Sequence, residues 1–175
     1  MKKLKWYIVN KEYVKYLKLF DNKVENIDYD KNIKPYIGIV LNIDSFKYYV
    51  PISSPKEKHY KMEEDIDFIK IIDKKGSILG VLNLNNMIPI LDSEIEELKY
   101  DEIDEIKTFN NEREKQLYLM LLRLEIKIMN GKVEKILRNA SKLYDLKGKK
   151  PKSKIAKRCC DFKKLEGKAI EYNKG

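Results

Sequence analysis

The chain of 175 residues is long enough for one domain with a substantial apolar core, and no window approaches the roughly 18 apolar residues of a membrane span. Its 37 Lys and Arg against 28 Asp and Glu give a net charge of +9, and residues 142–175 alone hold 12 basic and 4 acidic residues. A basic end on a nearly neutral body is typical of a protein that binds a polyanion, although the lysine bias of an AT-rich genome would give the same count.

Two features of the sequence bear on localisation and redox state. The first apolar stretch, Trp6–Val9, is too short for the core of a signal peptide, so we expect the protein in the cytoplasm. Cys159 and Cys160 are adjacent, a spacing that suits neither a disulfide framework nor a metal site, and we expect two reduced, buried thiols.

The first 90 residues are predicted to be mainly β, with one early helix. Leu4–Val9 alternates as a strand does, and Asn10 is expected to cap a helix that runs to Phe20, before a polar loop over residues 21–33. Two strand pairs and a short fifth strand follow: Tyr36–Leu41, Lys47–Ile52, Ile66–Ile72, Ser77–Asn83 and Met87–Ile90. Between the two pairs, Ser54–Met62 is predicted to be an exposed loop.

Residues 91–175 are predicted to be mainly helical. The acidic segment Asp92–Ile106 is expected to be a solvated helix or loop. The strongest helical pattern covers Asn111–Met129, where one face collects the apolar residues Leu117, Met120, Leu121, Leu124 and Ile128. Further helices are predicted beyond a break at residues 130–131: Val133–Tyr144 and, after a linker at residues 148–153, Phe162–Tyr172. Strands followed by helices indicate an α+β fold with a curved antiparallel sheet, in one domain over residues 1–175.

The sequence excludes several kinds of nuclease site. His59 is the only histidine, so an acid–base pair of two histidines cannot form within one chain. The sequence has no metal-ligand cluster, no glycine-rich phosphate loop and no glycine elbow around Ser53 or Ser54. Lysine, serine and tyrosine side chains remain, and these suit phosphate binding and the stabilisation of charge on a pentavalent phosphorus.

Four spaced motifs occur along the chain: KPYIGIVL at residues 34–41, FKYYVPISSPKEKH at 46–59, LNNMIPI at 84–90 and CCDFKKLE at 159–166. Together they resemble the ToxN/AbiQ family, the endoribonuclease toxins of type III toxin–antitoxin systems, from Tyr7 to Ile90 and again at the last motif. The resemblance implies a compact SH3-like antiparallel barrel embellished with helices. It also implies a site that needs no metal and no cofactor.

The resemblance implies catalytic roles for four residues. The family carries an essential Ser/Thr-Ser-x-Lys where this chain has Ser53, Ser54 and Lys56, and an active-site lysine where it has Lys34. Without the resemblance, the first three would be a strand-to-loop transition, and Lys34 a solvated residue before a proline. We expect the two lysines to hold and neutralise the scissile phosphate and the two serine hydroxyls to form hydrogen bonds with its oxygens.

Three further residues are catalytic candidates. Tyr13 matches the family's tyrosine at the start of the first helix and would assist proton transfer, whereas its helical spacing alone would make it a core residue. Tyr29 corresponds to a family loop tyrosine that lies a variable distance before the lysine. His59 fits the pattern SPKxxH, or could support the site from a loop. A lysine could act as the base only with a pKa well below its usual value of about 10.4.

The implied activity is cleavage of single-stranded cellular or phage mRNA to leave a 2′,3′-cyclic phosphate and a 5′-hydroxyl. The implied partner is a small antitoxin RNA of repeated pseudoknots, which the toxin processes and which stays bound as its inhibitor, in closed rings of three toxins and three RNAs. We expect the phosphates of this RNA to contact the following residues: Lys147, Lys149, Lys150, Lys152, Lys154, Lys157 and Arg158.

Two other classes of protein remain open at this point. A non-catalytic RNA-binding protein would use the same basic surface, and a protein-interaction module would dock a partner on the acidic face of residues 92–106. A toxin should arrest cells when it is expressed alone, which sets it apart from a protein that only binds RNA.

Overall fold

The computed structural model describes residues 2–26, the backbone of residues 28–29, and residues 32–175. Its strands form a sheet of seven strands and a separate two-stranded hairpin, with antiparallel pairing throughout. The sheet contains β1 (Lys5–Val9), β4 (Tyr36–Ile43), β5 (Phe46–Ser53), β6 (Phe68–Ile72), β7 (Ile78–Asn83), β8 (Ile88–Pro89) and β9 (Ile95–Glu97), and the hairpin joins β2 (Asp28–Tyr29) to β3 (Asn32–Ile33).

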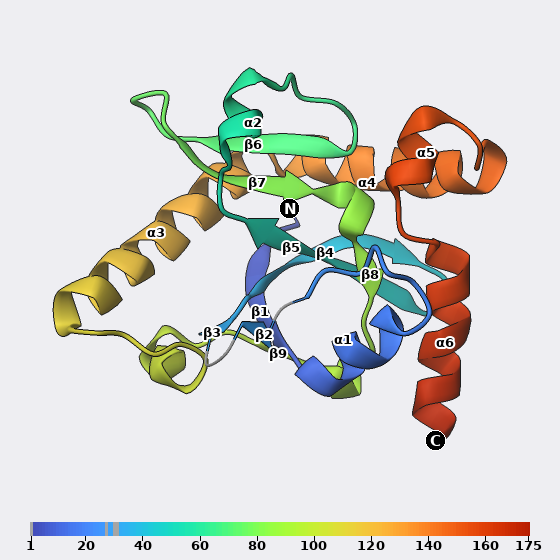
Figure 1. The fold of residues 1–175 in the computed structure, drawn as a ribbon, viewed down its shortest axis with the longest axis horizontal. Coiled ribbons are helices and arrows are strands. Elements are labelled where there is room, and N and C mark those ends of the chain that lie inside the picture. The colour runs from blue at the N-terminus through green and yellow to red at the C-terminus, as the bar shows by residue number, and fades with distance from the viewer. Residues whose placement is uncertain (1, 27, 30–31) are drawn as a thin grey trace.

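Helices make up most of the C-terminal half. The α-helices are α1 (Lys11–Lys18), α2 (Glu57–Lys61), α3 (Glu112–Gly131), α4 (Val133–Lys149), α5 (Lys154–Arg158) and α6 (Phe162–Lys174), and the 3-10 turns are η1 (Leu84–Asn86), η2 (Asp92–Glu94) and η3 (Tyr100–Glu105). In Figure 1, α3 and α6 flank the sheet on opposite sides. The predicted α+β class, with strands first and helices later, is confirmed.

The sheet is open. Its strand order is β6-β7-β5-β4-β1-β9, with β8 paired to β5 outside this path, and no pairing joins β6 to β9 within the described residues. The barrel that the resemblance implied is therefore not closed. The edge strand β9 carries Glu96 and Glu97, and charged side chains on an edge strand oppose further strand pairing.

The strand β5 ends at Ser53 and leads into the segment of the predicted site residues. It is joined to β4 by a hairpin whose turn residue Asp44 has a φ of 52°, in the left-handed region that Asp tolerates better than most residues. At the other end of β5, Ser53 pairs with Val81 of β7. The next residues leave the sheet at Pro55, which has no backbone N–H for a further ladder bond.

Capping residues in the sequence predicted where several helices begin and end. The side chain of Asn10 accepts a hydrogen bond from the N–H of Glu12 at 3.0 Å, and that of Asn111 accepts one from Glu114 at 2.9 Å. The predicted break between the two long helices falls at Gly131, where α3 ends. Two predicted loops contain regular structure: β2 and β3 lie within residues 21–33, and α2 lies within residues 54–62. The acidic segment 92–106, predicted as a helix or loop, also holds the strand β9, and α5 lies just after the predicted linker, where no element was predicted.

The buried face of α3 differs from the predicted apolar face. The buried residues of α3 are Leu119, Leu122, Glu125 and Met129. The exposed apolar ones are Leu117, Met120 and Leu124, at 55%, 61% and 41% exposure. Leucines lie on both faces, and the packing of α3 against β6, β7 and α4 decides which of them is buried. The indole N–H of Trp6 also donates to the backbone carbonyl of Leu122 at 2.9 Å.

Two smaller predictions concern the thiols and the membrane. Cys159 and Cys160 are free and fully buried, as predicted, and burial raises the pKa of the Cys159 thiol to about 11. Within the part of the chain that the structure describes, none of the helices has the length and apolar character to span a bilayer.

Candidate functional site

Ser53, at the end of β5, belongs to the walls of two cavities. The smaller cavity, of about 210 Å³, includes Lys34, Ser53 and Ser54 in its wall. The larger cavity, of about 470 Å³, includes Ser53 and Lys56. The hydroxyl of Ser53 accepts a hydrogen bond from Nδ2 of Asn83 on β7 at 3.4 Å. The structure therefore brings the four predicted residues Lys34, Ser53, Ser54 and Lys56 into one region.

His59 holds the turn that carries Lys56. The backbone N–H of Lys56 donates to Nδ1 of His59 at 2.8 Å, and the His59 N–H donates to the Lys56 carbonyl at 2.9 Å. The ring is 5% exposed and packs on Phe68 of β6, with centroids 5.5 Å apart. Burial, and then the charges of Lys58 and Lys56, lower the pKa of His59, which favours the neutral form that can accept at Nδ1. His59 thus positions Lys56 from a buried site at the wall of the larger cavity.

Glu25 connects Lys34 to the larger cavity. Its Oε2 lies 3.7 Å from Nζ of Lys34, and its Oε1 accepts a hydrogen bond from Nδ2 of Asn86 at 2.8 Å. Glu25 and Asn86 both line the larger cavity, whereas Lys34 lines the smaller one. This network keeps the Lys34 ammonium group between the two cavities that share Ser53.

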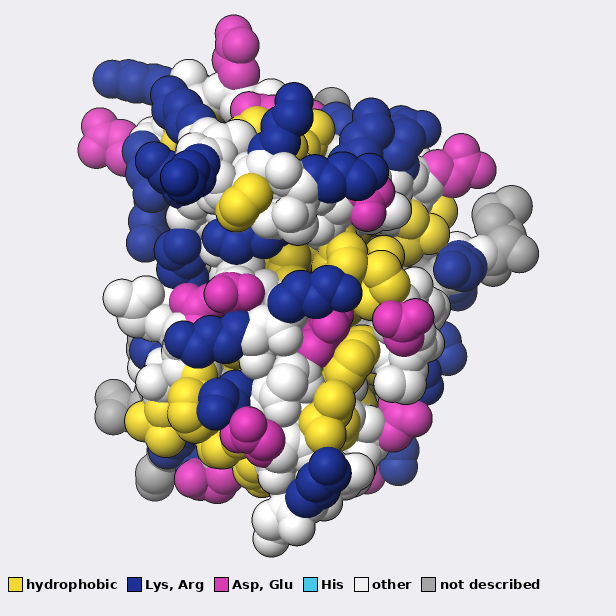
Figure 2. Space-filling model, turned by 90° about the vertical axis from the view of Figure 1, so that its right-hand side faces the viewer, with side chains coloured by type: hydrophobic (Ala, Val, Ile, Leu, Met, Phe, Trp, Pro, Cys, Tyr) yellow, Lys and Arg dark blue, Asp and Glu magenta, His cyan; other side chains and the backbone are white. Residues whose placement is uncertain are grey.

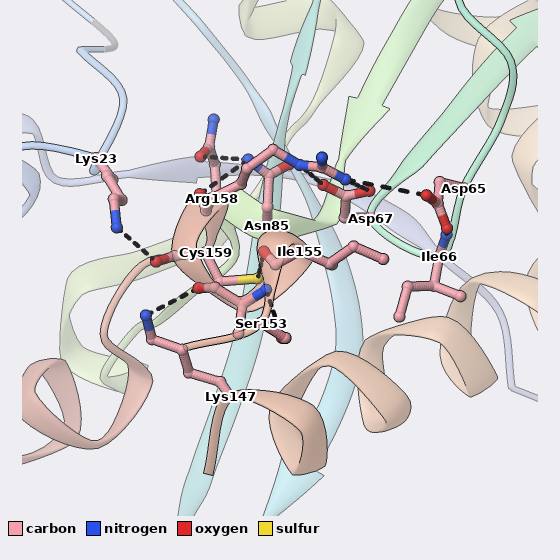
Figure 3. A network of polar contacts seen from close by, with 12 residues as sticks. Lys23, Asp65, Ile66, Asp67, Asn85, Lys147, Ser153, Ile155, Arg158 and Cys159 are labelled. Atoms are coloured by element: carbon pink, nitrogen blue, oxygen red, sulfur yellow. Dashed lines mark hydrogen bonds and ion pairs between the residues drawn. The ribbon is translucent and has the colours of Figure 1, made fainter. Parts of the chain in front are cut away.

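Arg158, at the end of α5, adds a guanidinium group to the larger cavity. Its Nε lies 2.9 Å from Oδ2 of Asp67 and its Nη2 lies 3.0 Å from Oδ1, and Nη2 is 4.0 Å from Oδ2 of Asp65 (Figure 3). Asp67 is 3% exposed, whereas the Arg158 side chain is 43% exposed. Arg158, which was predicted to contact antitoxin RNA, therefore lies in the same cavity wall as Ser53 and Lys56.

The remaining predicted RNA-binding residues lie at the end of α4, on α5 and in the short segment between the two helices. Lys147 is half-buried, and its Nζ donates to the carbonyl of Ala156 at 2.9 Å, which ties α4 to α5 (Figure 3). The others are exposed: Lys149, Lys150, Lys152, Lys154 and Lys157. Figure 2 faces the α5–α6 side of the molecule and shows Lys and Arg side chains gathered over its upper part, where α5 lies. We call these five exposed lysines the basic cluster.

Of the two tyrosine candidates, Tyr13 lies in the core and lines neither cavity. Tyr13 is fully buried, its hydroxyl donates to the carbonyl of Pro89 at 2.7 Å, and its ring meets Tyr172 edge-on at 5.1 Å. Burial also raises its pKa, so Tyr13 has the core position that its helical spacing indicates, and the geometry does not support its predicted role in proton transfer. The backbone of Tyr29 pairs with Asn32, and its side chain lies outside the described residues.

Two of the wall residues that were not predicted from the sequence are Glu125 and Asp67. Glu125 on α3 is 4% exposed and lines the smaller cavity, and burial raises its pKa to about 8. Its spacing of three from Leu122 and four from Met129 could have placed it on the buried face. Asp67 has no comparable signal, because its partner Arg158 is 91 positions away in the sequence.

The site combines cations and hydroxyls around a hollow surface. Lysine ammonium groups and serine hydroxyls are donors that suit a phosphate with developing negative charge. Within the described part of the chain, no group of three or more His, Cys, Asp or Glu side chains is arranged to hold a metal ion. The geometry thus suits a site that binds and stabilises a phosphodiester.

A family of proteins described as "Toxin ToxN, type III toxin-antitoxin system" matches residues 5–170 of the chain. The chain belongs to this family. Endoribonuclease ToxN of Bacillus thuringiensis subsp. kurstaki is 31% identical over 173 residues, which cover 96% of this chain and 84% of that protein. Endoribonuclease AbiQ of Lactococcus lactis subsp. lactis is 35% identical over 178 residues, which cover 98% of this chain and 90% of that protein.

Solved structures of the ToxN family have the same fold. One comes from work on selective toxin inhibition by a non-coding RNA pseudoknot, with a TM-score of 0.83, 26% identity, and coverage of 99% of this chain and 100% of that one. Another is AbiQ, a lactococcal anti-phage endoribonuclease, with a TM-score of 0.82, 28% identity and the same coverage. The predicted family and the predicted endoribonuclease toxin of a type III system are confirmed.

Proposed function

We propose that this endoribonuclease toxin cuts single-stranded RNA without a metal ion. The 2′-hydroxyl loses its proton and its oxygen forms a bond to the neighbouring phosphorus, while the bond from phosphorus to the 5′-oxygen of the next nucleotide breaks and that oxygen takes up a proton. The products carry a 2′,3′-cyclic phosphate and a 5′-hydroxyl. Lys34 and Lys56 hold and neutralise the phosphate, and the hydroxyls of Ser53 and Ser54 donate hydrogen bonds to its oxygens. His59 positions Lys56 through the Lys56 N–H.

One observation carries this proposal: the four residues border two cavities that share Ser53. A phosphodiester beside Ser53 would have one lysine on each side of it, which distributes positive charge around the pentavalent phosphorus. Preorganised donors of this kind stabilise a transition state because they need no reorientation as charge develops.

We further propose that the toxin's inhibitor is a small RNA of pseudoknot repeats, which the toxin cuts and retains in a closed assembly of three chains and three RNAs. Similar structures from work on a non-coding RNA pseudoknot and on a processed non-coding RNA support an RNA of this kind. Arg158 lies in the cavity wall next to the basic cluster, so an RNA bound along α5 would reach the cutting site and block it.

Analysis of the product ends tests the proposed chemistry. An unstructured RNA is incubated with the protein in EDTA, and both new ends are identified by mass spectrometry. We expect a 2′,3′-cyclic phosphate and a 5′-hydroxyl, and a cleavage rate in EDTA equal to the rate without EDTA. A 3′-hydroxyl with a 5′-phosphate, or an activity that EDTA removes and Mg²⁺ or Mn²⁺ restores, would contradict it.

A further inference from the structure

The smaller cavity has a lining that phosphate binding does not explain. Its volume of about 210 Å³ is below the roughly 300–1,000 Å³ of pockets that hold drug-sized molecules, so it suits a single planar ring system. Much of its wall is apolar or aromatic: Ile52, Leu79, Tyr118, Leu121 and Leu122. Lys34, Ser53 and Ser54 complete this wall, so a phosphate held by them would lie next to whatever fills the cavity.

Glu125 is the one carboxyl group in this wall, among the residues that the structure describes. It is 4% exposed, and burial is the one cause of its raised pKa: no hydrogen bond or charged neighbour among the described residues contributes to that shift. Gly80 of β7 leaves room for it, because a Cβ atom at residue 80 would lie 3.1 Å from Oε1 of Glu125. A ligand that forms a hydrogen bond with a carboxyl group in so apolar a wall would gain binding energy, because polar groups at buried positions are stabilised by a partner.

The charged and titratable groups that share the wall with Glu125 are Lys34, Lys107 and Tyr118. Nζ of Lys107 lies over the ring of Tyr118, 4.7 Å from its centroid, and Lys34 pairs with Glu25. Neither lysine forms an ion pair with Glu125. The carboxyl group is therefore left to face the cavity.

We propose that the smaller cavity takes one unpaired nucleobase next to the cut phosphodiester, and that Glu125 recognises this base through hydrogen bonds to its Watson–Crick edge. The inference rests on the proposed cleavage of single-stranded RNA. Proteins that read single strands splay a base out, pack it between apolar or aromatic side chains and bond to its edge. The apolar wall and the tyrosine ring would pack against the base, and the single carboxyl group would bond to its edge.

The protonation state of Glu125 decides which base fits. Burial raises its pKa to about 8, so the carboxyl is mainly neutral at neutral pH. A neutral carboxyl donates through its O–H and accepts through its carbonyl oxygen, which complements the amino group and ring nitrogen of adenine or cytosine. An ionised carboxylate only accepts, which complements the N1–H and amino group of guanine. The preference should therefore move from adenine or cytosine towards guanine as the pH rises.

The test maps the cut sites of a random single-stranded RNA in EDTA at about pH 6.5 and about pH 8.8, on either side of the raised pKa. The wild-type protein is compared with Glu125→Gln, whose amide keeps one donor and one acceptor at every pH, and with Glu125→Ala. Glu134→Gln, an exposed change on α4, is the matched control.

We expect the wild type and Glu134→Gln to prefer adenine or cytosine beside the cut at the lower pH and to lose about tenfold of this preference at the higher pH. Glu125→Gln should keep the preference at both, and Glu125→Ala should lose about tenfold of it at both. A folded Glu125→Ala with wild-type preference, or a Glu125→Gln that follows the wild-type pH change, would overturn the inference. If Glu125→Ala does not fold, the pH dependence of base preference in Glu125→Gln, compared with that of the wild type, decides the question by itself.

The two proposals fail in different ways. Absence of cutting by the wild-type protein would remove the proposed function and the base recognition with it. Normal cutting, with a base preference that ignores residue 125, would overturn the base recognition and leave the proposed function standing.

Discussion

Arg158 forms a two-point interaction with the buried carboxylate of Asp67, with N–O distances of 2.9 and 3.0 Å. The pair connects the end of α5 to the residue just before β6, across 91 positions of sequence. It also places a guanidinium group in the wall of the cavity that contains Ser53 and Lys56. The basic C-terminal end is therefore joined to the candidate cutting site by a specific contact and not by charge alone.

Arg158→Ala should destabilise the fold, because it leaves Asp67 buried at 3% exposure without its partner. An unsatisfied buried group of this kind costs ~1–3 kcal/mol. Arg158→Lys should be intermediate, since lysine keeps the charge but not the two-point geometry. Urea denaturation in a Lys56→Ala background measures this without toxicity. The control is the exposed Arg138→Ala, and equal stability of the two alanine variants would contradict the role of the pair.

His59→Ala should slow cleavage, because the Lys56 N–H loses its acceptor and the turn of α2 loosens. His59→Gln should restore part of the rate, since an amide oxygen at this position of a helix can accept the same N–H. If His59→Gln cuts as slowly as His59→Ala, the positioning role of His59 is contradicted.

Protonation of His59 should lower the stability of the fold in acid. Its folded-state pKa lies below the unfolded value of 6.5, so its contribution is present above about pH 6.5 and is lost as the pH falls through the folded pKa. Denaturation of the wild type and His59→Gln at pH values above and below 6.5 measures the difference. The wild type should lose more stability in acid than the glutamine variant, and equal losses would contradict this linkage.

Leu122→Ala should cost ~2–5 kcal/mol, the range for removing a buried leucine side chain. Leu117→Ala, on the same helix but 55% exposed, should change stability by about 0.5 kcal/mol or less. Thermal or urea unfolding of the pair tests which face of α3 packs on the sheet. A larger loss for Leu117→Ala would mean that the opposite face is buried.

Four substitutions in the basic cluster, at Lys149, Lys150, Lys152 and Lys157, should weaken binding of the antitoxin RNA. Each lost phosphate contact should flatten the log–log salt dependence by ~0.7 for single-stranded RNA. Cleavage of free RNA should suffer less, so the variant should stay toxic but be poorly neutralised. A Lys74/Lys75 double change in the β6–β7 turn is the control. Unchanged affinity and salt slope would show that the cluster is only a solvated surface.

Short-range signals in the sequence predicted much of the fold. Asn10 and Asn111 cap helices as their residue types indicate, and Gly131 ends α3 where the pattern breaks. The motif resemblance placed Lys34 and Ser53–Lys56, which the structure brings together. These features depend on neighbours in the chain or on recurring motifs, so one sequence is enough to find them.

Long-range contacts account for what the sequence did not predict. Which face of α3 is buried depends on its packing against β6 and β7, far earlier in the sequence, because α3 has leucines on both sides. The spacing of Tyr13 indicates a core residue whereas the motif resemblance implied a site residue, and its buried contact with Pro89 agrees with the spacing. The Asp67–Arg158 pair likewise depends on how α5 folds back onto the sheet.

The most direct measurement is single-turnover cleavage of an unstructured RNA by Ser54→Ala and Lys56→Ala, beside the control Lys61→Ala. Lys61 is exposed on the same short helix as His59, outside both cavity walls. Loss of one preorganised donor should slow the first two variants ~10²–10³-fold, about 2.7–4 kcal/mol, with folding and RNA binding kept and Lys61→Ala unchanged. If Ser54→Ala and Lys56→Ala both cut as fast as the wild type, RNA is cut elsewhere on the molecule.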